Sequence, residues 1–126
     1  MAKTIIETKK APRPVGPYSQ AVEVDGTLYC SGQIPLDPET GEVFTGDMKK
    51  QTQMVMENVQ AVLNAAGMNF NNVVKTTIFL TDINDFNQVN NVYVTYFDKE
   101  PPARSCVAVA SLPKGVNVEV EVLARR

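Results

Sequence analysis

The alternation of apolar and polar residues predicts strands near both ends of the chain. Between Ser19 and Ser31, apolar residues alternate on either side of Asp25-Gly26, a dipeptide that tolerates the positive φ angles of a tight turn. Two antiparallel strands joined by a hairpin are expected there. Near the other end, four valines share one strand face and a mostly polar set shares the opposite one: Val116, Val118, Val120 and Val122 against Asn117, Glu119, Glu121 and Leu123.

Two segments between these strands have the three- and four-residue spacing of amphipathic helices. The first follows Asp47, a residue type that caps helix N-termini, and stops at Gly67. Its apolar positions are Met48, Val55, Val59, Val62 and Ala66. The second starts near Asp82 to Asp85 and is expected to end at Pro101-Pro102, because neither proline has an amide hydrogen to donate. Its apolar positions are Phe86, Val89, Tyr93, Tyr96 and Phe97.

The remaining segments complete the fold prediction. β-Branched residues predict a mostly buried strand over Val73 to Leu80, and the prolines and glycines of Gly32 to Gly46 predict a long ordered loop. Arg104 to Ala110 and Val116 to Ala124 are expected to complete the chain as strands. This order of elements predicts an α+β fold in one domain, residues 1–126, with both helices on one side of a mixed sheet. Because the second face of the sheet is partly apolar, a partner subunit is expected to cover it.

Composition limits the chemistry that such a domain can perform. The 126 residues include no histidine, which excludes imidazole bases, Ser-His and Cys-His pairs, and zinc sites that need a histidine ligand. Proton transfer is therefore left to carboxylates, tyrosine or water. No phosphate-binding loop, dinucleotide fingerprint or clustered metal-ligand spacing occurs in the sequence, so neither a cofactor nor a metal is expected.

Charge and cysteine usage indicate the compartment and the class of partner. The net charge of −2 gives no basic excess for a phosphate backbone, so nucleic acid is disfavoured as a partner. Cys30 and Cys106 are too few for a disulfide framework and suit reduced thiols. The sequence shows neither a signal peptide nor a membrane span, and a cytoplasmic protein is expected.

Arg104 is the strongest candidate for a functional residue. It lies between Pro101-Pro102-Ala103 and an apolar strand, and a guanidinium that keeps its charge in a partly buried strand needs an anion. That anion is either a ligand carboxylate or phosphate, or a carboxylate of this chain, and spacing does not separate the two. The internal candidates are Glu119, Glu121 and Asp82.

Four further positions have both a structural and a chemical interpretation. Cys106 shares the strand face of the arginine, where a small buried hydrophobe is favoured over a nucleophile. Glu119, close to Glu121, is either a general acid or base or part of a charged outer face of the sheet. Tyr18 either presents its phenol from a loop or caps the sheet edge. Ser31-Gly32-Gln33 either brings backbone amides to an anion or only turns the chain.

Several segments occur together at a recognisable spacing. They are Gly16-Pro17-Tyr18-Ser19-Gln20, Ser31-Gly32-Gln33-Ile34-Pro35, Val74 to Leu80 with Asp82, and Pro102-Ala103-Arg104-Ser105-Cys106-Val107 with Leu112-Pro113. Together they resemble the RidA (YjgF) family of reactive-intermediate deaminases over nearly the whole chain. The resemblance implies a chorismate-mutase-like fold assembled as a homotrimer, with the sheets forming a central barrel, the helices outside, and ligand clefts between subunits.

The resemblance also implies an activity and a set of residue roles. The activity is hydrolysis of 2-imino or enamine acids, such as 2-iminopropanoate and 2-iminobutanoate, to 2-oxo acids and ammonia. The residues that it places at the substrate are Arg104, Gly32, Cys106 and Asn90. Arg104 would hold the substrate carboxylate, Glu119 would position or activate water, and Tyr18 would assist proton transfer.

The resemblance changes one topological expectation. A simple hairpin through Leu112 to Gly115 would put Glu119 on the sheet face opposite Arg104. In the family fold the last strand is instead inserted elsewhere in the sheet, and neighbouring subunits complete the site. One departure from the family is visible: many members carry a glutamate and an arginine where this chain has Ala108 and Ser111, which bears on the subunit contact and the substrate preference.

Two other functions fit the same resemblance. One is a non-catalytic regulatory protein that binds a small carboxylate metabolite, since relatives have been assigned regulatory roles in purine metabolism. The other is the endoribonuclease or translation-inhibitor activity ascribed to some relatives. The acidic net charge and the absence of histidine weigh against an RNA-directed activity.

Overall fold

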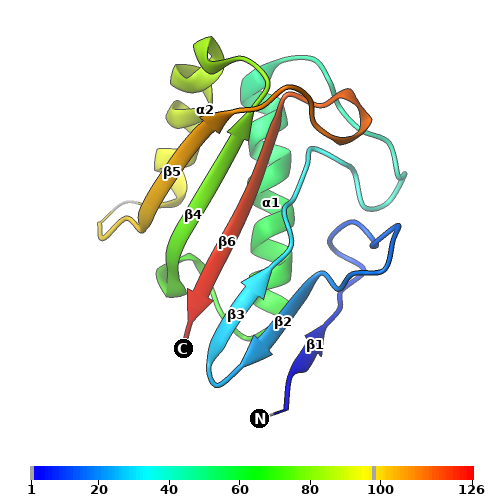
Figure 1. Ribbon diagram of the computed structural model, residues 1–126, viewed down its shortest axis with the longest axis vertical. Helices are drawn as coiled ribbons and strands as arrows, with labels where there is room; N and C mark the ends of the chain where they lie inside the picture. The colour runs from blue at the N-terminus through cyan, green and yellow to red at the C-terminus, as the bar shows by residue number, and fades with distance from the viewer. Residues whose placement is uncertain (1, 98) are drawn as a thin grey trace.

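The alternating segments of the sequence form one mixed sheet with two helices behind it. The computed structural model describes residues 2–97 and 99–126, and Figure 1 shows both helices on the same side of the sheet. The strands are β1 (Thr4–Ile6), β2 (Ala21–Val24), β3 (Thr27–Cys30), β4 (Val73–Leu80), β5 (Ala103–Ala108) and β6 (Val118–Arg125), and the helices are α1 (Met48–Ala65) and α2 (Phe86–Tyr93). The predicted α+β class, with two helices on one face, is confirmed.

The last strand lies in the middle of the sheet. The strand order is β1-β2-β3-β6-β4-β5, and every neighbouring pair is antiparallel except β4 and β5, which are parallel and joined through α2. The insertion of β6 away from β5 is therefore confirmed, and no hairpin joins the two. As a consequence β5 is an edge strand, which decides how exposed Arg104 is.

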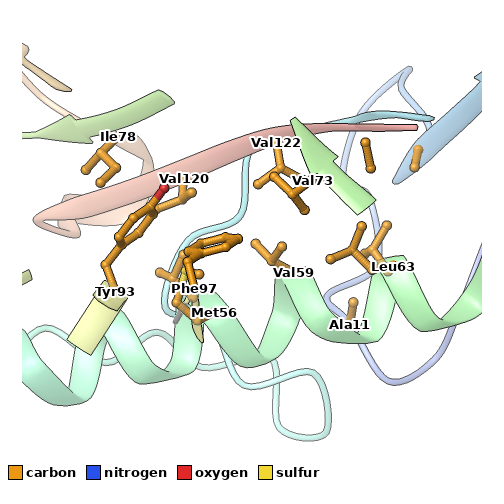
Figure 2. Close-up of a cluster of buried hydrophobic side chains, with 14 of the residues drawn as sticks. Ala11, Met56, Val59, Leu63, Val73, Ile78, Tyr93, Phe97, Val120 and Val122 are labelled. Carbon is orange, nitrogen blue, oxygen red and sulfur yellow. The ribbon is translucent and has the colours of Figure 1, made fainter. Parts of the chain in front are cut away.

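The core lies between α1 and the valine face of β6. The side chain of Asp47 caps the helix by accepting a hydrogen bond from the backbone N–H of Lys50 at 3.2 Å, and Gly67, with φ of +73°, ends it, as predicted. Figure 2 shows Met56, Val59 and Leu63 of this helix packed beneath β6 and β4. Burying each such side chain contributes about 1.5–3 kcal/mol of transfer free energy.

Four elements differ from the predicted bounds, and one of them is β6, which begins at Val118 rather than Val116. β1 was not predicted, because three residues are too few to show an alternating pattern; it is held by pairing with β2. Strand β5 ends at Ala108 rather than Ala110. Helix α2 ends at Tyr93, before Pro101-Pro102, because the hydroxyl of Thr95 donates to the carbonyl of Val92 at 2.7 Å and the chain tightens into a 3₁₀ turn.

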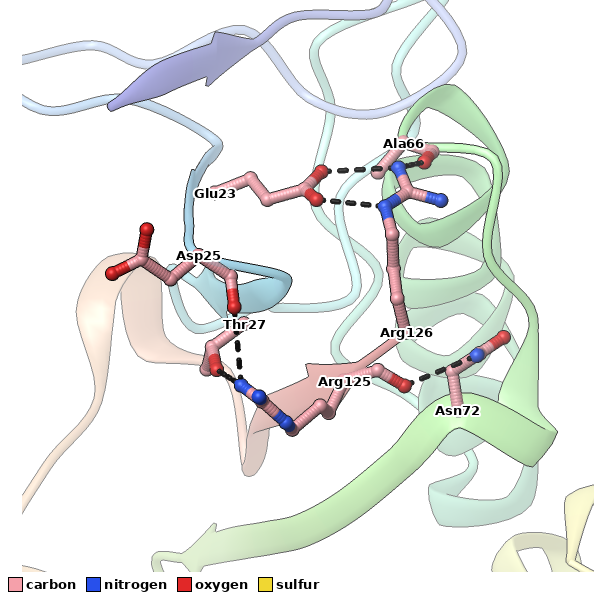
Figure 3. A network of polar contacts seen from close by, with 7 residues as sticks. All are labelled: Glu23, Asp25, Thr27, Ala66, Asn72, Arg125 and Arg126. Carbon is pink, nitrogen blue, oxygen red and sulfur yellow. Dashed lines mark hydrogen bonds and ion pairs between the residues drawn. The ribbon is translucent and has the colours of Figure 1, made fainter. Parts of the chain in front are cut away.

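The end of β6 is fastened to the end of α1. Figure 3 shows the Arg126 guanidinium between Glu23 and the carbonyl of Ala66, to both of which it donates hydrogen bonds, and the Arg126 Nε to Glu23 Oε2 distance is 2.7 Å. The side-chain amide of Asn72 donates to the carbonyl of Arg125 at 3.1 Å. These contacts place the positive charge of Arg126 at the C-terminus of α1, where the helix dipole favours a cation. No helix of the described residues is long and apolar enough to cross a membrane.

Candidate functional site

A cavity of about 560 Å³ opens beside β6 on the side of the sheet away from the helices. Its walls are mainly apolar and come from the loop before β2, the loop after β3 and the turn before β6. Three residues predicted for the site, Tyr18, Gly32 and Glu119, line this one cavity. The other lining residues are Pro12, Arg13, Val15, Gln20, Ser31, Gln33, Ile34, Leu36, Pro113, Lys114 and Glu121.

An irregularity in strand pairing brings Gly32 against Glu119. Tyr29 pairs with Leu123 and Gln33 pairs with Val120, so the chain leaving β3 advances four residues while β6 advances three. The extra residue breaks the regular alternation, as in a β-bulge. A Cβ atom added to Gly32 would lie 2.1 Å from Glu119 Oε2, so only glycine leaves room for this carboxylate. The interpretation of Gly32 as a simple turn residue is therefore insufficient.

The environment of Glu119 changes its affinity for a proton. Its side chain is half-buried, and this burial, with a smaller contribution from the negative charge of Glu121, raises the pKa of Glu119 above its ordinary value of 4.5. A carboxyl group with a raised pKa is a stronger base when it is ionised. It is therefore better suited than a surface glutamate to accept a proton from water near neutral pH.

Buried amide side chains fix the cavity walls. The side-chain amide of Gln20, which is 3% exposed, donates to the carbonyl of Pro12 at 2.9 Å and so holds the loop that carries Tyr18. On the other wall, the side-chain amide of Asn58 from α1 donates to the carbonyls of Ile34 and Leu36 at 3.1 and 2.9 Å. Because these bonds satisfy buried groups, breaking them is costly, and the cavity is largely preformed.

Tyr18 lines the cavity and is exposed to solvent. Its side chain is 52% exposed, and its backbone N–H donates to the carbonyl of Gly16 at 2.9 Å, which forms a tight turn. The phenol is thus presented from a loop, as one of the two sequence interpretations expected. Because much of the ring is in water, this side chain is free to contact a ligand.

Arg104 lies elsewhere, on the edge strand β5. It is exposed, so the expectation that the strand partly buries this arginine is wrong; β5 has a neighbouring strand on one side only. The Arg104 Nη1 donates to Asn90 Oδ1 at 2.8 Å, and its guanidinium lies over the rings of Phe86 and Tyr93. Within residues 2–97 and 99–126 no carboxylate lies within salt-bridge distance of Arg104, so the internal pairs considered for it do not form.

Cys106 lies on the same strand face as Arg104, as predicted. It is paired with Ile78 and is half-buried against the core. Burial raises the pKa of Cys106, and the positive charge of Arg104 only partly opposes this. Burial likewise raises the pKa of Cys30 to about 12. Both thiols are therefore disfavoured as nucleophiles, in agreement with the packing interpretation.

The predicted site residues fall into two groups on opposite faces of the sheet. Arg104 is paired with Thr76, whose side chain points to the helices, whereas Glu119 is paired with Phe79, whose side chain points to the open face. One group is therefore Tyr18, Gly32 and Glu119, and the other is Arg104, Asn90 and Cys106. The insertion of β6 beside β4 therefore leaves Glu119 on the face opposite Arg104, the same outcome that was expected only for a hairpin. A single chain does not bring the two groups together.

Two charged residues of the cavity were not predicted from the sequence. Arg13 and Lys114 both line the cavity that contains Glu119. Lys114 has φ of +58°, which is unusual for a residue other than glycine and places it at the tip of the turn before β6. A signal was present, since Arg13 lies between two prolines and Lys114 lies between Pro113 and Gly115, positions that favour exposed turns.

Comparisons with known proteins agree over nearly the whole chain. Residues 8–126 match the model of a family described as endoribonuclease L-PSP. The chain is 52% identical over 124 residues to a RutC family protein of Pyrococcus abyssi, covering 98% of each. It is 49% identical over 122 residues to a Mus musculus protein named 2-iminobutanoate/2-iminopropanoate deaminase, covering 97% of this chain and 90% of that one.

A solved structure gives the same result. The crystal structure of E. coli TdcF with bound serine matches this fold with a TM-score of 0.93 and 45% identity, covering 98% of each chain. The similarity to these proteins therefore covers nearly the whole chain, and not only the segments that first suggested the family. The chain is a member of the RidA (YjgF) family, whose family model is the one described as endoribonuclease L-PSP.

Proposed function

We propose that this protein hydrolyses reactive 2-imino and enamine acids, such as 2-iminopropanoate and 2-iminobutanoate, to 2-oxo acids and ammonia. The observation that carries the proposal is the position of Glu119. Its half-buried carboxyl, with a raised pKa, lies in the wall of a preformed cavity that Tyr18 and Gly32 also line. The name of the mouse relative supports the choice of substrate.

The reaction needs little beyond positioned groups. Arg104 holds the substrate carboxylate, and Glu119 takes a proton from the water whose oxygen bonds to C2 of the imine. Glu119 passes this proton on to the imine nitrogen, which gives a carbinolamine. Tyr18 assists transfer of the hydroxyl proton of the carbinolamine to the same nitrogen; the C=O bond forms as the C–N bond breaks, and ammonia and the 2-oxo acid leave. No step requires imidazole, a metal or a cofactor, which suits a chain without histidine.

The two groups of site residues are united by assembly in this proposal. A homotrimer brings the Glu119 cavity of one subunit to the Arg104 strand of its neighbour, and backbone groups at Gly32 and Cys106 complete the pocket. Exposed apolar side chains on the open sheet face support such a contact, among them Ile5, Tyr29 and Val107, which are 46%, 52% and 43% exposed.

A binding function without turnover and an RNA-directed function are the alternatives. A regulatory protein would use the same groups to hold a small carboxylate, and the serine bound to E. coli TdcF fits either case. The family model carries the word endoribonuclease, but the net charge of −2 and the absence of histidine do not favour RNA cleavage. We place the reaction in the cytoplasm, where two free cysteines stay reduced.

A coupled assay tests the proposal. A threonine or serine dehydratase supplies the imine, and the release of 2-oxo acid is followed with and without this protein. Wild type should accelerate the release, and Arg104→Ala should lose at least about 100-fold in kcat/KM because a charge-assisted pair is removed. Arg125→Ala, which removes an exposed arginine that donates to Thr27 and does not line the Glu119 cavity, is the matched control and should stay active.

The assay separates the alternatives. No acceleration by wild type, or full activity in Arg104→Ala, contradicts the proposed function. Saturable binding of a 2-oxo acid by calorimetry without imine turnover would identify the regulatory alternative instead. RNA degradation that persists in Arg104→Ala would show that such an activity does not use this site.

A further inference from the structure

We infer that helix α2 is a preformed support for Arg104: the rings of Phe86 and Tyr93 and the amide of Asn90 fix the guanidinium before any ligand binds. Asn90 is then a positioning residue that acts through Arg104, and not a group that contacts the substrate. This inference rests on the proposed function only for what Arg104 binds. The support itself is a property of the ligand-free chain.

The three residues share one face of α2. They are separated by four and three positions, the spacing that aligns side chains on a helix. The guanidinium carbon of Arg104 lies 5.1 Å from the Phe86 ring centroid and 5.0 Å from the Tyr93 ring centroid. Both distances are within the range of a cation–π contact. The hydrogen bond from Arg104 Nη1 to Asn90 Oδ1 sets the rotation of the guanidinium plane.

The support is anchored in the core. The hydroxyls of Tyr93 and Thr76 share a buried hydrogen bond of 2.8 Å, and Thr76 is the residue on β4 that pairs with Arg104. The Tyr93 ring also lies 4.8 Å from the Phe97 ring, centroid to centroid. Because sheet and helix both hold Tyr93, the surface that it offers to the guanidinium has a fixed position.

Fixing Arg104 in advance improves binding for two reasons. An arginine on an exposed edge strand has many rotamers, and ordering it on binding would cost conformational entropy that the support removes beforehand. The bond to Asn90 uses a hydrogen of Nη1, so the other N–H groups of the guanidinium remain available for a forked pair with a carboxylate. The aromatic faces hold the charge without neutralising it, as an internal carboxylate would.

Nuclear magnetic resonance measures this support directly. The ¹⁵N order parameter of Arg104 Nε in the ligand-free protein should exceed about 0.8, the value of a rigid group, and should fall below about 0.6 in Phe86→Leu. Phe86→Tyr keeps the ring and should keep the order. The resonance is assigned by its loss in Arg104→Lys. Asn90→Ala, at a half-exposed position, gives a second variant that should also loosen the side chain.

Kinetics provide the second readout. Phe86→Leu should raise KM for the imino acid about three- to fivefold, the worth of one exposed cation–π contact, with kcat changed less than about twofold. Phe86→Tyr should restore the wild-type KM. A merely structural role for Phe86 would not leave kcat unchanged while altering the order of one arginine.

Two results would overturn the inference. The first is an Arg104 Nε that is as mobile in wild type as in Phe86→Leu and Asn90→Ala. The second is a Phe86→Tyr variant that behaves like Phe86→Leu. Since the order parameter needs neither substrate nor turnover, its outcome stands even if the deaminase assay fails, and a mobile arginine in an active deaminase would refute the support alone.

Discussion

The Glu119 cavity and the Arg104 support place their charged groups in opposite environments. Glu119 is half-buried among apolar walls, and that burial raises its pKa. Arg104 is exposed on an edge strand and lies over aromatic rings. The difference follows from the work proposed for each group. A base needs its proton affinity shifted, which desolvation does, whereas a cation that recognises a ligand needs a fixed direction while it stays accessible.

The largest predicted effect separates binding from chemistry. Arg104→Ala should weaken binding of a 2-oxo acid, measured by calorimetry, by about 100-fold because the charged partner of the carboxylate is lost. Glu119→Gln should keep that affinity within about threefold while kcat falls at least about 100-fold, the usual contribution of a general base. Equal effects of the two variants on affinity would show that binding and chemistry are not separated between the two regions.

Gly32→Ala is the next prediction, because it changes the cavity without changing any charge. The new Cβ would meet Glu119 Oε2 at 2.1 Å, so the carboxylate must move, and kcat should fall by up to about 100-fold. Adding Gly32→Ala to Glu119→Gln should cause little further loss, since both act on one group.

A matched glycine serves as the control for this prediction. A Cβ added to Gly16 would make only an ordinary contact with the Tyr18 ring, at 3.6 Å, so Gly16→Ala should keep activity within about threefold. A Gly32→Ala variant with wild-type kcat would show that the position of the Glu119 carboxylate does not matter.

The smallest predicted effect is on stability. A carboxyl group whose pKa is raised by folding holds its proton more tightly in the folded chain, so its ionisation destabilises the fold as pH rises above the ordinary value of 4.5. Glu119→Gln removes this penalty. Water screens the half-exposed group, so the melting temperature at pH 7 should rise by less than about 4 °C, the shift that 1 kcal/mol causes in such a domain.

Measuring melting temperature against pH checks the sign. The difference between Glu119→Gln and wild type should shrink toward zero as pH falls below 4.5, where the carboxyl is protonated in both the folded and the unfolded chain. A difference that instead grows on acidification would mean that the native environment favours the ionised carboxylate.

Local patterns in the sequence predicted most of the fold. A few neighbouring residues were enough to indicate the buried face of β6, the turn of the Asp25-Gly26 hairpin and the start of helix α1. β1 is too short to carry such a pattern. The end of α2 depends on a threonine hydroxyl that competes for a backbone carbonyl, which periodicity does not reveal.

The sequence indicated most of the candidate site residues, but not Arg13 and Lys114, and not how the residues are arranged. The position of Glu119 against Gly32 depends on one extra residue in the β3–β6 pairing, which joins segments far apart in the sequence. Arg13 and Lys114 line the same cavity from opposite ends of the chain, so no local motif indicates that they lie together. The exposure of Arg104 follows from the edge position of β5, which only the strand order fixes.

Complementation between inactive variants tests the central claim, that neighbouring subunits combine the Glu119 cavity with the Arg104 support. Arg104→Ala and Glu119→Gln are each prepared alone, then unfolded, mixed in equal amounts and refolded together, and imine hydrolysis is measured. Random assembly gives about a quarter of the shared sites both intact groups, so activity should return to about a quarter of wild type. Activity no greater than the average of the two separate variants would contradict a shared site.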